Sequence, residues 1–559
     1  MTAAVSSRSY DVVIVGSGVA GALVAWQLAE SGRRVLILEA GEEGAPREEL
    51  LEKYAAATNK SLGSPYVASQ PAKTPGPEQY GGAQDPPPLS ARDEYYEQKG
   101  KDKYLSTYER RAGGSTWHWL GHTPRLLPND FNLKSLYGVG VDWPISYADV
   151  EPWYCAAERA LGVAGDEAQW ANIHGAFRSQ PFPMPPIWTS YSDDYMIRRV
   201  DGRPILGVPV RILATPAARN SWPYDGRPPC AGNASCIPLC PIGAKYDASV
   251  HVTKARRAGA ELTTRAIVTK LHCEPDGTVR RVTYRPWGGS EQTVSGKLVI
   301  VAANAIETPK LLLLSAGEGV PKGIANSSDQ VGRNLMDHLQ KSVYARMSEP
   351  VFPFRGPPST AGIEVFRDGP SRRQLGALRI SLDNDGWVSR GAPYHEAEQL
   401  VEQGLYGEGL RRALRENVLR QYRLSCSTEV LPDPDNRVTP SNLLDSSGIP
   451  RPRLTFAAAK YTLDALDKAL DAMTEILALA GGVASAIGPI GGAGHIMGTC
   501  RMGSDGATAV VDGWGRAFDH PNLFIVGSST FPTCGTANPT LTIAALALRT
   551  ADRIQHAGI

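Results

Sequence analysis

The sequence lacks the features that mark a membrane-spanning or exported protein. No window of the 559-residue chain approaches the roughly 20 uninterrupted apolar residues of a transmembrane helix. The N-terminus, MTAAVSSRSYDVVIVG, has neither the basic region nor the long apolar run of a signal peptide. We therefore expect no direct membrane span, and the sequence taken alone predicts a cytoplasmic protein.

An excess of charge of either sign is also missing. The chain has 58 basic and 57 acidic side chains, so charge gives no reason to expect nucleic acid or an anionic membrane surface as a partner. Neither an internal repeat nor a long low-complexity segment is found. With 559 residues, of which 42% are hydrophobic, the chain is expected to form a globular protein of two or more domains.

Cysteine is scarce outside one short segment. Five of the eight cysteines stand singly, as buried thiols usually do: Cys155, Cys273, Cys426, Cys500 and Cys534. The other three, Cys230, Cys236 and Cys240, fall within the eleven residues CAGNASCIPLC. This segment, which we call the cysteine loop (228–244), is the part of the cysteine pattern that requires a chemical explanation.

Four uses of the cysteine loop can be compared: a zinc site, a disulfide, a redox switch and an iron–sulfur cluster. Structural zinc usually takes four ligands in two CxxC-like pairs, and the sequence has no second pair. A disulfide would leave one thiol over in a chain whose other cysteines are single. Clustered thiolates before a proline suit an iron–sulfur cluster, and three ligands match the 3Fe-4S type. A fourth ligand such as Cys155 would make it 4Fe-4S.

The beginning of the chain is typical of a dinucleotide-binding unit. Apolar runs at 10–16 and 34–39 predict buried parallel strands, and 19–31 between them predicts a helix. In Gly16-Ser-Gly18-Val-Ala-Gly21 the first glycine permits a tight turn, the second lets a pyrophosphate approach, and the third lets helix and strand pack closely. Glu39 follows at the end of the second strand, where its carboxylate would accept hydrogen bonds from a ribose. The alternative is a glycine turn in an unrelated unit.

The remaining elements are expected in separated parts of the chain. Strands are predicted at 298–303 and 522–527, and helices from Pro309, over 397–420, over 460–480 and over 539–554. Residues 45–100 are rich in Pro, Gly and charge, which predicts loops and a lid-like excursion. We expect a Rossmann-like dinucleotide-binding domain built from 1–45, 101–135, 225–335 and 490–559. The segments 46–100, 136–224 and 336–489 would form an inserted α+β substrate domain and lid-like loops, so the fold class is α/β.

Four further segments resemble the glucose-methanol-choline (GMC) family of FAD oxidoreductases. They are RAGGSTWHW at 111–119, NAIETPKLLLLS at 304–315, GHIMGT at 494–499 and TANPTLT at 536–542. The second departs from the family pattern at Asn304 and just after Ser315. The cysteine loop, GRNLMDH at 332–338 and DHPNLF at 519–524 are similar to the flavoprotein subunits of bacterial sugar dehydrogenases acting on glucose, fructose, gluconate or glucosides. A more distant similarity is to pyranose oxidases.

This resemblance implies FAD as the cofactor and oxidation of an alcohol by hydride transfer to the flavin. It implies that His495 is the base that takes the hydroxyl proton and that Asn538 holds the substrate oxygen. Asn538 before Pro539 is equally typical of a helix N-cap. The residues implied to bind FAD, besides the first glycine motif and Glu39, are Gly113, Gly114, Ser115, His118, Asn304, Thr308, Asn538, Pro539 and Thr540. Pyranose oxidases carry a histidine covalently bound to FAD at the position of His118, so the resemblance implies that His118 contacts the flavin and could be bound to it. The alternative is that His118 has only a structural role, packed between Trp117 and Trp119.

The resemblance also implies a route for the electrons. In the similar dehydrogenases the cysteine loop holds a 3Fe-4S cluster, although Ala231 replaces a cysteine that many of them have. They work with a small chaperone-like subunit, often carrying a twin-arginine signal, and a cytochrome c subunit, so the chain is expected to reach the periplasm or membrane through a partner. The alternatives are a pyranose-oxidase-like enzyme using O2, an electron-transfer flavoprotein without alcohol chemistry, and an NAD-dependent dehydrogenase.

Overall fold

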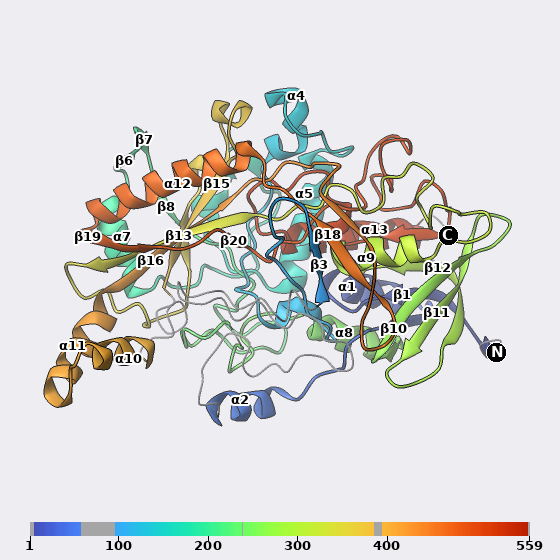
Figure 1. Cartoon of the computed structure of the whole chain (residues 1–559), viewed down its shortest axis with the longest axis horizontal. Coiled ribbons are helices and arrows are strands. Elements are labelled where there is room, and N and C mark those ends of the chain that lie inside the picture. The colour runs from blue at the N-terminus through green and yellow to red at the C-terminus, as the bar shows by residue number, and fades with distance from the viewer. Residues whose placement is uncertain (1–4, 57–94, 238, 385–393, 557–559) are drawn as a thin grey trace.

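Two seven-stranded β-sheets organise the computed structural model, which describes residues 5–56, 95–237, 239–384 and 394–556. In Figure 1 the first sheet lies on the right with helices α1 (Val19–Glu30) and α13 (Thr540–His556), and the second lies on the left with helix α12 (Lys460–Leu479). The expected α/β class, a Rossmann-like sheet from separated segments with a second α+β part, is confirmed.

The first sheet is parallel and is extended by an antiparallel hairpin. Its parallel strands lie in the order β21 (Leu523–Ile525), β12 (Gln292–Val301), β1 (Val5–Val15), β2 (Val35–Leu38) and β9 (Glu261–Thr263). The hairpin of β10 (Ala266–Cys273) and β11 (Val279–Pro286) pairs with the other half of β12. Strand β2 is buried throughout, which explains its uninterrupted apolar sequence. Helix α1 packs against α13 and α8 (Ser249–Arg257).

The second sheet is antiparallel and also gathers distant segments. Its order is β19 (Gly482–Ile487), β13 (Leu339–Met347), β16 (Gln421–Thr428), β15 (Leu378–Asp383), β14 (Ala361–Ile363) and β8 (Ile212–Ala214), and the short β20 (Gly491–Gly492) also pairs with β13. Helix α12 packs on β13, β15 and β16. A smaller sheet joins β17 (Arg437–Leu444), β18 (Pro450–Thr455) and β3 (Glu97–Lys99).

Shorter helices and hairpins connect these sheets. The helices are α4 (Leu133–Tyr137), α5 (Tyr147–Leu161), α6 (Glu167–Trp170), α7 (Tyr191–Val200), α10 (Tyr394–Glu402) and α11 (Gly407–Arg420), with 3-10 turns at η1 (Gly114–Trp117), η2 (Pro128–Asn132), η3 (Val365–Arg367), η4 (Pro370–Arg373) and η5 (Ser528–Thr530). Two hairpins pair β4 (Asn172–Ile173) with β5 (Ala176–Phe177) and β6 (Pro204–Ile205) with β7 (Val208–Pro209). The single helix predicted over 397–420 is therefore two helices, and both Gly404 between them and Gly407 at the start of α11 have positive φ.

The helix predicted from Pro309 begins five residues earlier. Helix α9 (Asn304–Leu314) starts at Asn304, whose φ is 56° and whose Oδ1 accepts hydrogen bonds from the backbone N–H groups of Ile306 and Glu307 at 2.8 and 3.2 Å. The asparagine side chain thus satisfies two N–H groups that a helix start leaves unpaired. Proline lies inside the helix, so the prediction that it marks the first turn is wrong.

Part of the segment expected to be loops is helical. Helix α2 (Arg47–Ala56) carries Glu48 and Glu49 in its first turn and a Glu49–Lys53 ion pair of 2.6 Å, both of which favour a helix. Its Leu50 is 3% exposed and packs with Trp117 and Leu239, contacts that the sequence pattern does not reveal. The rest of the expected lid-like excursion, 57–94, lies outside the described residues.

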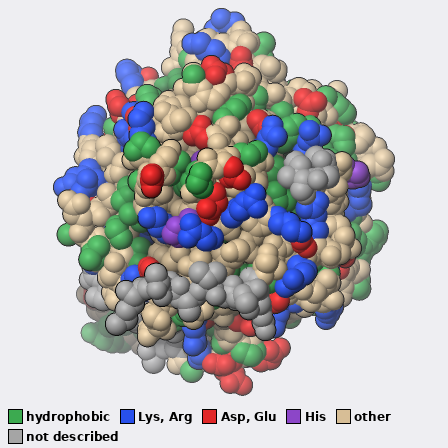
Figure 2. All heavy atoms as spheres, turned by 90° about the vertical axis from the view of Figure 1, so that its right-hand side faces the viewer, with side chains coloured by type: hydrophobic (Ala, Val, Ile, Leu, Met, Phe, Trp, Pro, Cys, Tyr) green, Lys and Arg blue, Asp and Glu red, His purple; other side chains and the backbone are tan. Residues whose placement is uncertain are grey.

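The surface agrees with the balanced composition. On the face shown in Figure 2, which is the right-hand side of the molecule in Figure 1, basic and acidic side chains are interspersed.

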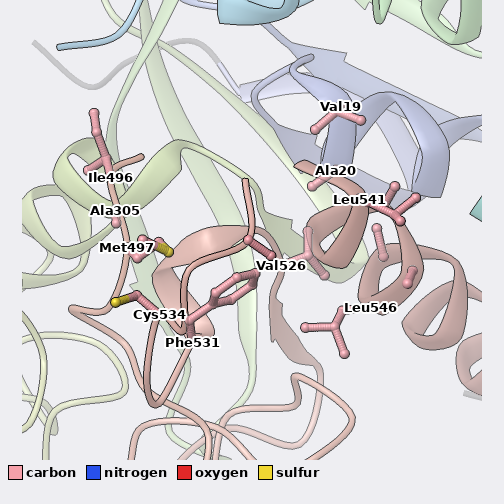
Figure 3. Packing of buried hydrophobic residues seen from close by; sticks show 14 of the residues in the cluster. Val19, Ala20, Ala305, Ile496, Met497, Val526, Phe531, Cys534, Leu541 and Leu546 are labelled. Carbon is pink, nitrogen blue, oxygen red and sulfur yellow. The ribbon is translucent and has the colours of Figure 1, made fainter. Parts of the chain in front are cut away.

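Within the described ranges, none of the helices combines the length and the apolar character needed to cross a bilayer. The interior is a continuous apolar core, and Figure 3 shows part of it, where Val19 and Ala20 of α1 lie near Leu541 of α13.

Candidate active site

One cavity runs along the carboxyl ends of the parallel strands of the first sheet. Its empty space is about 1830 Å³, open mouth included. Of the residues predicted for the cofactor and for catalysis, the structure brings twelve into its wall: Gly16, Gly18, Glu39, Gly113, Gly114, Ser115, His118, Asn304, His495, Asn538, Pro539 and Thr540. Gly21 and Thr308 are buried beside the cavity and do not line it.

The glycine turn after β1 has the geometry that its motif predicts. Gly16 has φ 97°, and a Cβ there would lie 2.7 Å from the carbonyl oxygen of Ala302. A Cβ on Gly21 would lie 2.0 Å from the carbonyl oxygen of Gly16, so this glycine permits α1 to approach the turn. A Cβ on Gly18 would meet no atom within 4 Å. The space over Gly18 therefore belongs to the cavity.

Glu39 closes the turn from the end of β2. Its Oε2 accepts hydrogen bonds from the backbone N–H and the hydroxyl of Ser17 at 2.9 and 2.6 Å, and its Oε1 accepts one from the backbone N–H of Gly41 at 2.8 Å. Burial raises the pKa of this carboxyl, and the three hydrogen bonds oppose the rise. The side chain is held in the cavity wall, with carboxylate lone pairs left for a further donor.

The second glycine-rich segment lies directly on the first. The backbone N–H of Gly113 donates to the carbonyl of Ser17 at 3.2 Å, and a Cβ on Gly114 would lie 3.3 Å from Cα of Gly18. Both glycines have positive φ, 93° and 58°, and η1 begins at Gly114. The two motifs, about 95 residues apart in the sequence, thus form one wall of the cavity.

His118 follows η1 and is held by a carboxylate that the motif did not suggest. Its Nδ1 lies 2.9 Å from Oε2 of Glu109, and both side chains are less than 8% exposed. Arg111 contacts the other oxygen of Glu109, with Nε at 2.6 Å. These two contacts lower the pKa of Glu109 despite its burial. The carboxylate is therefore ionised, and it orients the ring of His118 in the cavity wall.

His495 and Asn538 meet in the wall of the same cavity. The amide Nδ2 of Asn538 lies 3.1 Å from Nε2 of His495. The carbonyl of Pro539 accepts a hydrogen bond of 2.9 Å from Ile543, so proline, and not Asn538, takes the N-cap place of α13. Burial is the main cause that lowers the pKa of His495 well below 6.5, with His338, His122 and Arg379 adding to it. His495 is therefore neutral at pH 7.

Backbone pairing before β13 places a second histidine against His495. Met336 and Met497 exchange hydrogen bonds of 2.9 and 3.0 Å, and the N–H of Ala493 donates to the carbonyl of His338 at 3.0 Å. Asp337 accepts the N–H of His495 at 3.0 Å. In Figure 3 Met497 lies in the core near Ala305 and Cys534. As a result the ring centroids of His338 and His495 lie 5.0 Å apart, with the rings edge to face.

Several cavity residues were missed from the sequence. His122 lines the cavity and its Nε2 lies 2.8 Å from the carbonyl oxygen of Ser359. Glu307 on α9 accepts from Tyr108 and pairs with Lys310 at 2.7 Å and Arg110 at 3.2 Å, and all four line the cavity. In the sequence these residues stand within or beside the family-like segments. That position does not reveal which side chains they contact.

The cysteine loop lies next to the His118 segment. Cys236 and Cys240 are 6% and 7% exposed, and all eight cysteines of the chain are free. The buried Lys245 joins the two segments, because its Nζ donates to the carbonyls of Trp117 and Trp119 at 2.7 Å each and of Cys236 at 3.0 Å. Arg47 of α2 adds a hydrogen bond of 2.6 Å to the carbonyl of Cys240.

The donor chemistry of this loop fits iron and sulfide, but its geometry does not. Among the residues that the structure describes, no three His, Cys, Asp or Glu side chains come together as a metal-binding group. Burial raises the pKa of Cys236, which favours the thiol over the thiolate that a metal needs. Cys155 lies in α5 with Sγ 3.2 Å from Arg125 and 3.1 Å from Glu151.

Comparison with protein families covers three parts of the chain. Residues 217–340 and 432–547 match two models of the GMC oxidoreductase family, and residues 11–47 match that of FAD dependent oxidoreductases. The cavity fits FAD, because the open space over Gly18, the N-terminus of α1 and the carboxylate of Glu39 would hold its diphosphate and ribose.

Individual relatives cover nearly the whole chain. The fructose dehydrogenase large subunit of Gluconobacter japonicus is 35% identical, over 98% of this chain and 98% of the relative. The 6'''-hydroxyparomomycin C oxidase of Streptomyces lividus is 30% identical over 98% and 92%. The crystal structure of pyridoxine 4-oxidase from Mesorbium loti shares the fold, with a TM-score of 0.63 at 18% identity over 98% and 99%. The chain therefore belongs to the GMC oxidoreductase family and is an FAD-dependent oxidoreductase.

Proposed function

We propose that this protein is a dehydrogenase that oxidises a hydroxyl group of a sugar or sugar derivative by hydride transfer to FAD. The observation that carries the proposal is the His495–Asn538 pair, a neutral imidazole and an amide 3.1 Å apart in the wall of the FAD cavity. The 35% identity with a fructose dehydrogenase subunit supports a sugar as the substrate class.

The two side chains divide the work on the hydroxyl group. Nε2 of His495, kept unprotonated by its low pKa, accepts the hydroxyl proton, and the amide N–H of Asn538 donates to the same oxygen. When bound, FAD supplies the hydride acceptor. Both groups are partly buried in the cavity wall, where their mutual contact keeps them oriented.

Sugar-dependent reduction of a dye acceptor tests this proposal. The panel would contain glucose, gluconate, fructose, sorbitol and alkyl glucosides, and the variants would be His495→Ala, Asn538→Ala and, as a control, His556→Ala at the exposed end of α13. We expect at least one sugar to be oxidised and His495→Ala to lose about 100-fold or more in rate. A His495→Ala protein that oxidises sugars normally would favour an electron-transfer flavoprotein and reject the proposed role.

The proposal assigns the two sheets to two tasks. The FAD-binding unit would comprise 1–45, 101–135, 225–335 and 490–559, and the substrate unit would comprise 136–224 and 336–489 with 46–100. The strands support this division, since those of the first sheet all come from the former set and those of the second come almost entirely from the latter. The exception is β20 at Gly491–Gly492, next to His495, so the catalytic segment begins on the substrate side.

We further propose that Cys230, Cys236 and Cys240 of the cysteine loop would hold an iron–sulfur cluster of the 3Fe-4S type, which would supply one-electron transfer toward a partner. Three free thiols in eleven residues support it, as does the loop's contact through Lys245 with the segment that lines the cavity. Cluster binding would then require the loop to rearrange so that its thiolates converge. As the resemblance to sugar dehydrogenase flavoprotein subunits implies, the proposed partners are a small chaperone-like subunit and a cytochrome c acceptor. The proposed location is periplasmic and membrane-associated.

Metal and sulfide analysis of freshly purified anaerobic protein tests the cluster. We expect about three iron atoms per chain, a paramagnetic signal from the oxidised protein, and loss of both in Cys236→Ser but not in Cys500→Ser, a buried single cysteine. Protein with full flavin content and no iron would reject the cluster and leave the sugar oxidation standing.

A sugar oxidase that uses O2 is the second candidate, favoured by the 30% identity with an oxidase and by thiols that do not converge. Oxygen uptake during turnover, measured against dye reduction, separates the oxidase from the dehydrogenase.

FAD attached covalently to His118 is compatible with both enzymes, and the position of His118 in the cavity wall supports the covalent bond. Flavin that is released completely by acid denaturation would reject the covalent bond.

A further inference from the structure

His338 is a buried histidine in direct contact with His495, and neither the family motifs nor the proposed function assigns it a role. It is fully buried, and it follows Asp337 just before β13. Its Nδ1 lies 2.8 Å from Nδ1 of His495, and its Nε2 lies 3.0 Å from the carbonyl oxygen of Gly535 and 3.3 Å from that of Cys534. Both ring nitrogens therefore have defined partners, and these partners determine where the protons lie.

The Nε2 atom of His338 must carry a proton. A carbonyl oxygen only accepts hydrogen bonds, and both neighbours of this nitrogen are carbonyl oxygens. Burial lowers the pKa of His338 to about 4, so at pH 7 the ring is neutral and has one proton. Because this proton is on Nε2, Nδ1 has a lone pair and acts as an acceptor.

The acceptor at Nδ1 of His338 then determines the tautomer of His495. Two ring nitrogens 2.8 Å apart form a hydrogen bond only if one of them carries the proton, so this proton belongs to Nδ1 of His495. Since His495 is also neutral at pH 7, its Nε2 has the lone pair. The amide Nδ2 of Asn538, a donor 3.1 Å from that Nε2, agrees with this assignment.

We propose that His338 is a positioning residue that holds His495 in the Nδ1–H tautomer and so keeps the Nε2 lone pair directed into the cavity as the base. The inference rests on the proposed role of His495. When Nε2 takes the substrate proton, the Nδ1–H group of His495 keeps its acceptor, and the cation that forms is stabilised by a charge-assisted hydrogen bond. The groups that face the two rings are Asp337, His122, Arg379, Arg367 and Glu429.

The tautomer itself can be measured without any turnover. In the holoenzyme labelled with 15N-histidine, long-range proton–nitrogen spectra separate ring nitrogens that carry a proton from those with a lone pair. The signals of His495 are identified by their loss in His495→Gln. We expect a protonated Nδ1 and an unprotonated Nε2 in His495, and the reverse pattern in His338. A protonated Nε2 on His495 would overturn the proposal, even if His495→Ala shows that the residue is needed for sugar oxidation.

Rates of flavin reduction test the consequence. His338→Leu removes the acceptor, whereas His338→Asn returns an amide oxygen near the position of Nδ1, and His251→Asn is a matched buried histidine on α8 whose Nδ1 lies 2.8 Å from a tyrosine hydroxyl. We expect His338→Leu to slow flavin reduction at saturating sugar by about 10- to 100-fold with little change in the sugar concentration at half saturation, and His338→Asn to recover part of the rate. Equal rates in the Leu and Asn variants, or a rate in both like that of His251→Asn, would overturn it. If the Leu variant does not fold, the 15N measurement on the unmodified protein still decides.

Discussion

The glycines of the turn after β1 make separable predictions, because the structure gives them different surroundings. Gly18 has φ −63° and open space where a Cβ would be, and it lines the cavity. Gly21 is buried in α1, and its added Cβ would lie 2.0 Å from the carbonyl oxygen of Gly16, about 1.4 Å inside the 3.4 Å limit of ordinary contact. Gly18→Ala should therefore affect FAD alone, and Gly21→Ala should affect the fold.

The expected sizes follow from these distances. Gly21→Ala forces α1 or the Gly16 turn to move in a packed interior, which costs about 3 kcal/mol, the upper end of overpacking penalties. Gly18→Ala loses about 0.5–1 kcal/mol at the N-cap and gains about 0.4–1 kcal/mol from the unfolded chain, so the apo-protein's stability should scarcely change. Its methyl group enters the space over the turn, where close approach of the diphosphate requires glycine, so FAD affinity should fall at least about tenfold.

Urea denaturation of both apo-variants and titration with FAD, followed by flavin fluorescence, check this pair. The unmodified protein is the reference for both measurements. A Gly18→Ala protein that binds FAD normally would refute the assignment of the space over Gly18 to the cofactor. A Gly21→Ala protein as stable as the reference would refute the close approach of α1 to the turn.

Three other changes have expected outcomes. The rate of flavin reduction should stay constant as pH falls to 6.5 and decline only below it, because the pKa of the base His495 is lowered well below that value; stopped-flow rates that already fall by half at pH 7 would contradict this. Lys245→Met should leave three carbonyls without their donor and lower the free energy of unfolding, measured in urea, by about 1–3 kcal/mol or more. Cys236 should also react faster with a thiol reagent. Unchanged thiol reactivity would show that Lys245 does not hold the cysteine loop in position. Glu307→Gln should destabilise the protein by about 3 kcal/mol, the lower end for a buried ion pair because this carboxylate is partly exposed, since the buried Arg110 and Lys310 lose their counter-ion. The exposed Glu408→Gln should not, and equal unfolding midpoints for the two variants would contradict this role of Glu307.

The sequence was sufficient for elements whose signal is local. The strand, helix and strand at the N-terminus were predicted within a residue or two at most boundaries, because a buried parallel strand and a glycine-bounded helix are visible in short windows. Helix α2 was missed because it is stabilised by Leu50 packing on Trp117 and Leu239, which are far away in the chain. The start of α9 was missed because Asn304 acts through its side chain and not through apolar periodicity.

In the candidate site, too, local motifs predict some features and long-range contacts determine the others. The glycines and His495 could be proposed from motifs, and twelve of the predicted residues do line one cavity. The contact of His338 with His495 spans 157 positions and depends on β20 pairing with β13, so no local pattern contains it. Long-range pairing of this kind decides which nitrogen carries a proton, while the motif only supplies the histidine. A sequence can therefore name the base, but its protonation state is a property of the folded backbone, here of two carbonyls at Cys534 and Gly535 that face a buried ring.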